Sequence, residues 1–141
     1  NNIHLHLIPK FFNKSKIFFF TSFWMFFIIK KYNITHMLSQ CPILGGVAGI
    51  FASKFFRIPL MVEIHGDIYF NYMKELSIKN KLFSILCKYT FKNATKLRSL
   101  SSAMNDVLAQ YNFTDNVVVI PNRVNLDLFN SKKRIAQFLI R

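Results

Sequence analysis

The sequence predicts a three-layer α/β/α fold in which helices cover both faces of a parallel sheet. Short runs of aliphatic and β-branched residues alternate with segments of helical periodicity, and such β-α-β units pair their strands in parallel. The chain has 141 residues, of which 52% are hydrophobic and 18% are charged. That length suits one core, and that composition excludes an intrinsically disordered chain.

Five segments are predicted strands because they are short and rich in strand-forming residues. They are residues Ile3–Ile8, Ile34–Leu38, Leu60–Ile64, Lys96–Leu100 and Val117–Ile120. The run at 60–64 follows Pro59 and is apolar except for Glu63, which indicates a buried strand. The last run ends at Pro121, which lacks the amide hydrogen that a continuing strand needs.

The first predicted helix covers residues Ile17–Ile29, which are apolar almost all round and are bracketed by lysines. A helix of this length spans about 20 Å, which is less than the roughly 30 Å of a bilayer core. A secretory signal is disfavoured because Lys30 and Lys31 stand where small cleavage-site residues should be. Two interpretations remain: a helix packed in the core, or a helix in a membrane interface whose lysines reach the headgroups.

Three further helices are predicted between the strands. In Gly45–Phe56 large apolar residues repeat at helical spacing. A second face of this helix carries small residues, which allow close packing on a sheet. In Lys79–Asn93 an apolar stripe runs beside a row of lysines; the stripe is Leu82, Ile85, Leu86 and Tyr89, and the row is Lys81, Lys88 and Lys92. Ser101 or Ser102 is suited to cap the last helix.

The charge is strongly asymmetric, with 19 Lys and Arg against 6 Asp and Glu, for a net charge of +13. No carboxylate precedes Glu63. Such a chain favours polyanionic partners, either nucleic acid or an anionic membrane. We find no motif of a nucleic-acid-binding fold, so an anionic membrane surface is the expected partner and nucleic acid is not.

The cysteines and most histidines predict no metal or disulfide site. Cys41 and Cys87 are too few for a disulfide scaffold and indicate reduced thiols in the cytosol. His4 and His6 alternate along a predicted strand, yet no third ligand has a fitting spacing. His36 lies within a predicted strand, where we expect a core residue.

Ligands of an open parallel sheet bind at the carboxyl ends of its strands, which selects the candidate site residues. Gly45 and Gly46 open a helix whose amides and dipole favour an anion, although they match neither a dinucleotide fingerprint nor a P-loop. Close packing of that helix on the sheet is the alternative explanation. Asn122 and Arg123 follow the last strand and bring an amide and a guanidinium to the same edge.

His65 and Asp67 are the sharpest local signal, because they directly follow a buried strand. The imidazole is placed to exchange a hydrogen bond with a hydroxyl near neutral pH, and Asp67 could orient it or bind a hydroxyl itself. A structural turn formed by Gly66 and Asp67 is the alternative. Glu63 needs a polar partner if it lies inside a parallel sheet, so we expect it near this site.

In order along the chain, four stretches resemble the N-terminal domain of glycosyltransferase family 4 over roughly residues 34–130. They are residues 42–50 (PILGGVAGI), 57–67 (RIPLMVEIHGD), 94–103 (ATKLRSLSSA) and 117–129 (VVVIPNRVNLDLF). The resemblance implies the N-terminal half of a GT-B enzyme, in which two Rossmann-like domains face each other. In that family the C-terminal domain mainly holds a nucleotide-sugar donor and the N-terminal domain binds the acceptor.

The resemblance also implies roles for the candidate residues and a retaining reaction without a metal or other cofactor. His65 corresponds to the family's histidine near the transferred sugar, where it would act as the catalytic residue. Gly45 and Gly46 would lie near the donor diphosphate or the acceptor, and Asn122 falls in the family's Pro-Asn-Gly-Val stretch. Arg123 replaces the glycine of that stretch, which changes the turn and adds a charge.

The expected organisation is an acceptor-side domain at residues 1–130, followed at 131–141 by a linker or a truncated C-terminal segment. The expected enzyme is a glycosyltransferase of hexosyltransferase type that moves a sugar from a nucleotide sugar to a glycan or lipid-linked acceptor in polysaccharide biosynthesis. It would act in the cytoplasm at the inner face of the cell membrane, and this polypeptide alone would be inactive. The alternatives are a non-catalytic truncated remnant and a basic protein that binds membrane or nucleic acid.

Overall fold

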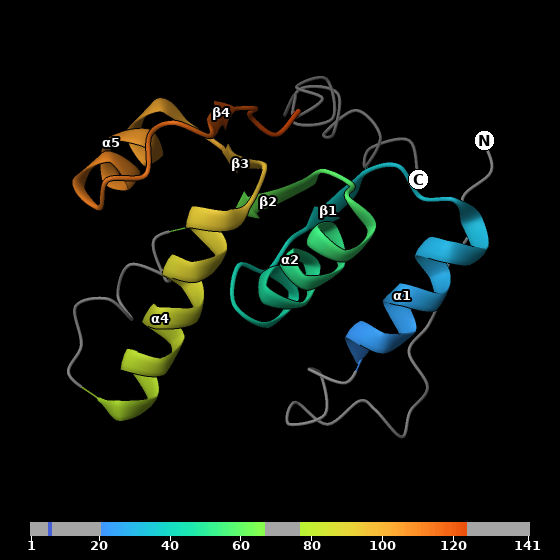
Figure 1. The fold of residues 1–141 in the computed structure, drawn as a ribbon. Helices are drawn as coiled ribbons and strands as arrows, with labels where there is room; N and C mark the ends of the chain where they lie inside the picture. The colour runs from blue at the N-terminus through green and yellow to red at the C-terminus, as the bar shows by residue number, and fades with distance from the viewer. Residues whose placement is uncertain (1–5, 7–20, 67–76, 124–141) are drawn as a thin grey trace, which may run out of the picture.

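The computed structural model describes residues 6, 21–66 and 77–123, and these form a parallel sheet with helices packed on it (Figure 1). The sheet has four strands in the order β1-β2-β3-β4, and every neighbouring pair is parallel. The helices are α1 (Thr21–Tyr32), α2 (Leu44–Phe56), α4 (Ile78–Asn93) and α5 (Ser102–Gln110). The strands are β1 (Met37–Ser39), β2 (Leu60–Ile64), β3 (Lys96–Ser99) and β4 (Val117–Val119). The predicted Rossmann-like α/β class is therefore confirmed.

The boundaries differ from the prediction where helix ends meet strands. α1 ends at Tyr32. The next residue, Asn33, has a φ of 49°, a left-handed conformation that asparagine tolerates better than most residues. The Ile34 amide then donates to the Ile29 carbonyl over 3.1 Å, so β1 begins only at Met37. The predicted strand at 3–8, apart from residue 6, and the segment at 131–141 lie outside the described residues.

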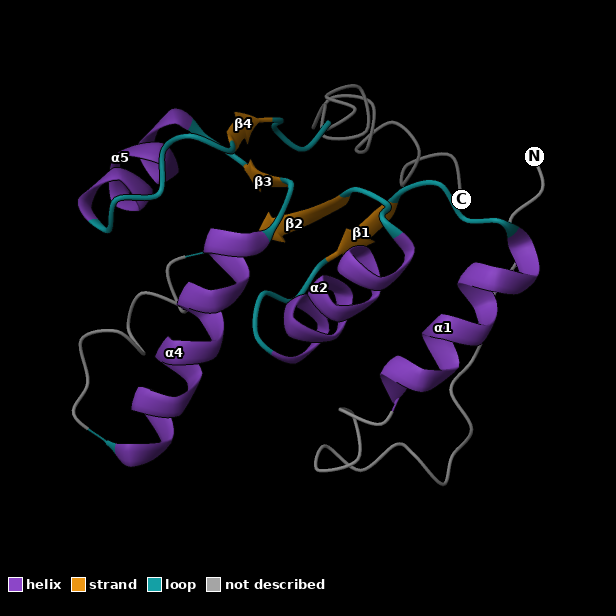
Figure 2. Ribbon diagram, viewed as in Figure 1, coloured by secondary structure: helices purple, strands orange, loops and turns teal. Residues whose placement is uncertain are grey.

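The main core lies on one face of the sheet. Strand residues Leu60, Val62, Ile64 and Leu97 share a single buried cluster with Ile50 of α2, Phe91 of α4 and Leu108 of α5. These three helices therefore cover the same face, as Figure 2 shows for α2 and α4. Consecutive strand order with crossovers of one hand places successive helices on one side. A helix layer on the opposite face is not found among the described residues.

α1 extends this helix layer beyond α2. The Phe26 ring of α1 contacts the Phe55 and Phe56 rings of α2, with centroids 5.2 and 5.1 Å apart. Ile29 is buried, so the apolar run contributes to the core, while Trp24 and Phe27 are exposed. The core interpretation therefore holds for the buried side of this helix, and the interfacial interpretation stays a prediction for its exposed side. None of the described helices has the length and apolar character required to cross a bilayer.

Leu82 and Ile85 of the predicted α4 stripe face away from the core, contrary to what amphipathic periodicity suggests, whereas Tyr89 of the same stripe packs against the core cluster. Leu82 and Ile85 are 55% and 63% exposed, whereas the buried side of the helix is Ser84, Cys87, Thr90 and Phe91. α2 and α4 pack closely, and an ideal Cβ built on Gly46 would lie 2.5 Å from the Thr90 Cγ2. Small side chains therefore occupy the α4 face that approaches α2.

Candidate functional site

The carboxyl ends of the four strands lie at one edge of the sheet because all strand pairs are parallel. This edge brings together His65 after β2, Ser101 after β3, residues 120–123 after β4, and the β1–α2 loop with Gly45. The predicted site residues that the structure describes are thus placed on one side of the molecule. Asp67 lies outside the described residues.

A buried carboxylate is the centre of this edge. Glu63, in β2, is 3% exposed, and its Cα is paired in register with that of Arg98 in β3. The two side chains therefore point to the same face of the sheet, and the Arg98 Nη1 donates to the Glu63 Oε1. A buried charge needs such a partner, so the expectation of a polar cluster around Glu63 is confirmed.

The same carboxylate holds the imidazole of His65. The Glu63 Oε2 lies 3.0 Å from the His65 Nε2, and both side chains lie on one face because they are two residues apart along an extended chain. Since the carboxylate accepts, the Nε2 carries the hydrogen of this bond and the Nδ1 is left for another partner. The His65 side chain is 40% exposed, so a ligand at the edge can reach it.

Arg98 joins this pair to the loop after β4. Its Nε donates to the Ile120 carbonyl over 2.9 Å, and its Nη2 donates to the Asn122 Oδ1 over 3.0 Å. A weaker contact of 3.4 Å reaches the Pro121 carbonyl. One guanidinium thus connects β2, β3 and the loop after β4, and it brings Asn122 into the same network as His65.

Sequence reasoning did not single out Arg98. The available signal was one acidic residue in the strand LMVEI and two basic residues in the neighbouring strand KLRS. Opposite charges inside adjacent parallel strands indicate a cross-strand pair, but only the register shows that the residues face each other.

The two glycines that open α2 have different surroundings. Gly46 is buried against Thr90 of α4, so it serves helix–helix packing rather than the expected helix–sheet packing. Gly49 provides the close approach to the sheet, where an added Cβ would meet the Leu60 side chain at 3.0 Å. Gly45 faces the β1–α2 loop, where an added Cβ would lie 3.1 Å from the Ser39 Oγ. The α2 N-terminus has no side-chain cap, which leaves it suited to an anion.

Three other sequence expectations have clear outcomes. The Ser101 Oγ accepts from the Met104 amide over 3.3 Å, so the predicted cap is confirmed. His36 is exposed rather than buried, because it precedes the shortened β1 at the open amino end of the sheet. Arg123 is exposed in the loop that carries Asn122. No cluster of three or more metal-ligating side chains occurs within the part of the chain that the structure describes.

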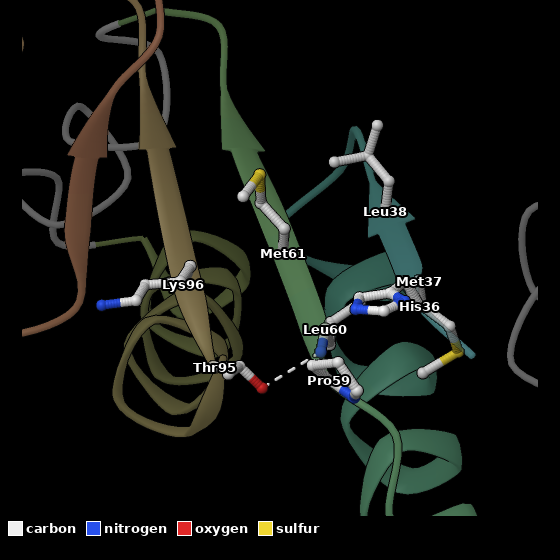
Figure 3. A pocket seen from close by; sticks show the side chains of 8 residues that line it. All are labelled: His36, Met37, Leu38, Pro59, Leu60, Met61, Thr95 and Lys96. Carbon is white, nitrogen blue, oxygen red and sulfur yellow. Dashed lines mark hydrogen bonds between the residues drawn. The ribbon is translucent and has the colours of Figure 1, made fainter.

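Two hollows near the sheet are lined by residues that the structure describes. One, of about 380 Å³, lies at the amino ends of the strands, opposite to the candidate site, and is lined mainly by apolar atoms (Figure 3). The other, of about 560 Å³, lies between α1, β1 and α2 and extends from Ile29 to the β1–α2 loop at Gln40, Cys41 and Gly45. Only the second one reaches the carboxyl edge.

Comparison with protein families matches residues 1–128 to the model described as Glycosyltransferase Family 4. No curated protein matches the chain. The match covers most of the chain, including all four strands, His65 and the loop after β4.

Proposed function

The chain belongs to glycosyltransferase family 4, and we propose that it forms the acceptor-side domain of a retaining hexosyltransferase that uses a nucleotide-sugar donor. The observation that carries this proposal is the Glu63–His65 pair at the carboxyl edge, held by Arg98. It presents an oriented, accessible imidazole where an open parallel sheet binds its ligand.

His65 is the residue that would touch the reacting sugar. With its Nε2 bonded to Glu63, its Nδ1 accepts a hydrogen bond from a sugar hydroxyl and helps to place the acceptor against the donor. Glu63 is a positioning residue, because it orients the ring and selects the tautomer. Arg98 is a second positioning residue, since it compensates the buried carboxylate and holds Asn122.

The residues around the imidazole would bind the rest of the substrates. Gly45 and the uncapped start of α2 suit a phosphate oxygen, and Arg123 adds a positive charge at the same edge. Such a site must mainly stabilise the negative charge on the departing diphosphate, and cationic groups do this without a metal. Asp67 remains a proposed hydroxyl-binding residue, and Gly46 a packing residue beside the phosphate position.

We infer that the acceptor is lipid-linked rather than a free glycan. The hollow between α1, β1 and α2 is lined by apolar side chains, among them Met25, Ile28 and Leu60, and it reaches the β1–α2 loop. An apolar chain could lie in it while the attached sugar faces His65.

The two cysteines are free thiols, which supports a reducing cytoplasmic location.

Saturation-transfer-difference NMR of the chain with saccharides, lipid-linked saccharides and nucleotide sugars tests this function. We expect saccharide signals that weaken in His65→Ala, with affinity lowered about tenfold by loss of a hydrogen bond to a polar group. His36→Ala is the matched control, since this histidine is exposed at the opposite edge. Absence of all saccharide signals would favour the non-catalytic remnant, and an equal effect of both variants would remove His65 from the site.

A further inference from the structure

The outer surface of the helix layer carries large apolar side chains on three neighbouring helices. α1 packs beside α2 and α2 beside α4, so their outward faces form one surface (Figure 1). We call it the helix-layer surface. Its apolar side chains are 43% to 88% exposed and are Trp24, Phe27, Phe51, Phe55, Ile78, Leu82 and Ile85. Exposed apolar side chains gathered on neighbouring helices are typical of an interaction site.

The exposed positions on α4 show that this is an organised face. Ile78, Leu82 and Ile85 are separated by four and three residues, so they lie on one line along the helix. They point away from Cys87 and Phe91, which are buried in the core. Polar residues normally occupy this outward line of a surface helix. The core therefore does not explain why it is apolar here.

The charges on this surface are all of one sign. The sequences of α1, α2 and α4 contain no aspartate or glutamate. Their exposed lysines are Lys30, Lys31, Lys54, Lys79, Lys81, Lys88 and Lys92. Three of these lie over aromatic rings, with the Lys31, Lys54 and Lys79 Nζ atoms 5.3 to 5.7 Å from ring centroids. Lysine stems thus run along apolar surface while their ammonium groups remain in water.

We propose that the helix-layer surface binds the interface of an anionic lipid bilayer. Aromatic and aliphatic side chains would enter the boundary between headgroups and acyl chains, and the lysines would contact lipid phosphates. A second copy of the chain would present the same positive charge, which disfavours self-association through this face. Nucleic acid would use the lysines but would leave the aliphatic line of α4 without a partner. The inference concerns membrane attachment and does not depend on sugar transfer.

Vesicle flotation of the full chain tests the proposal. We expect binding to vesicles that contain phosphatidylglycerol and little binding to phosphatidylcholine alone. Lys81→Glu/Lys88→Glu should lower the partition coefficient by about 25-fold or more, since each lysine near an anionic surface contributes a factor of about five. Leu82→Gln/Ile85→Gln should lower it by about tenfold, through loss of apolar area placed in the interface. All four positions are exposed, so the fold tolerates these changes, and far-UV circular dichroism verifies it.

Matched controls lie on the sheet, away from the helix layer. The control for the charge reversal is Lys96→Glu, and the control for the apolar change is Val119→Gln in β4, the strand farthest from β1 in the sheet. Both positions are exposed, and both variants should leave binding within about twofold. Trp24 is the single tryptophan of the chain, so its fluorescence reports on α1 alone. Brominated lipids should quench it when vesicles bind.

Four results would overturn the proposal. The first is equal binding to neutral and anionic vesicles, and the second is an equal loss in the sheet controls. The third is vesicle binding that depends on the lysines but not on Leu82 and Ile85, which would describe a general polyanion surface such as one for RNA. The fourth is concentration-dependent self-association that Leu82→Gln/Ile85→Gln abolishes in the absence of vesicle binding.

Discussion

Replacing Arg98 by methionine should destabilise the domain through the carboxylate that it leaves behind. Glu63 is 3% exposed, and Arg98 and His65 are its partners in the structure. Breaking a buried ion pair by removing one partner costs about 3–5 kcal/mol, because a charge remains buried without compensation. The Arg98 side chain is 18% exposed, so water can partly replace it and the lower limit applies. We expect a loss of about 3 kcal/mol at neutral pH.

Urea unfolding followed by circular dichroism measures this loss, and thermal unfolding should show a fall of about 10 °C in Tm. The diagnostic variant is Glu63→Gln/Arg98→Met, which replaces the charged pair by neutral groups. It should recover most of the stability, because no uncompensated charge remains inside the sheet. A loss below about 1 kcal/mol in Arg98→Met, or no recovery in the double variant, would refute the argument that charge compensation is the role of Arg98.

Other predictions concern packing and the thiols. Gly46→Ala should lower the free energy of unfolding by about 1–2 kcal/mol, because the new Cβ meets the rigid, buried Thr90 side chain, and Thr90→Ala should restore it. Gly66→Ala, where an added Cβ has nothing within 4 Å, is the control and should be neutral in the same urea titration. Burial, with a smaller contribution from Cys41, raises the pKa of the Cys87 thiol to about 12. In the folded chain a thiol reagent at pH 8 should therefore modify Cys41 alone. In the unfolded chain it should modify both cysteines. The pKa of Cys87 is thus higher in the folded chain than in the unfolded one, so its neutral thiol should stabilise the fold fully below about pH 9. This contribution should be lost as the pH rises toward 12, and urea unfolding measured across that pH range checks it.

The sequence was sufficient for the type and order of the described helices and strands, although not for all their boundaries, because local patterns encode them. The strand at residues 60–64 has the predicted boundaries, and the helix after Ser101 begins where its hydroxyl can cap it. Alternation of such segments is enough to predict parallel pairing, and parallel pairing is enough to place His65 at the carboxyl edge. These inferences need only the chemistry of neighbouring residues and the geometry of β-α-β units.

Tertiary structure decided which faces are buried and which distant side chains meet. α4 carries Leu82 and Ile85 outward because the close approach of α2 at Gly46 accepts only small side chains such as Thr90. The link between Glu63 and Arg98 exists because β2 and β3 pair in one register, and a shift by one residue would place the two side chains on opposite faces of the sheet. Periodicity along the chain defines the faces of a helix or strand, whereas the element that packs against it determines which of these faces is buried.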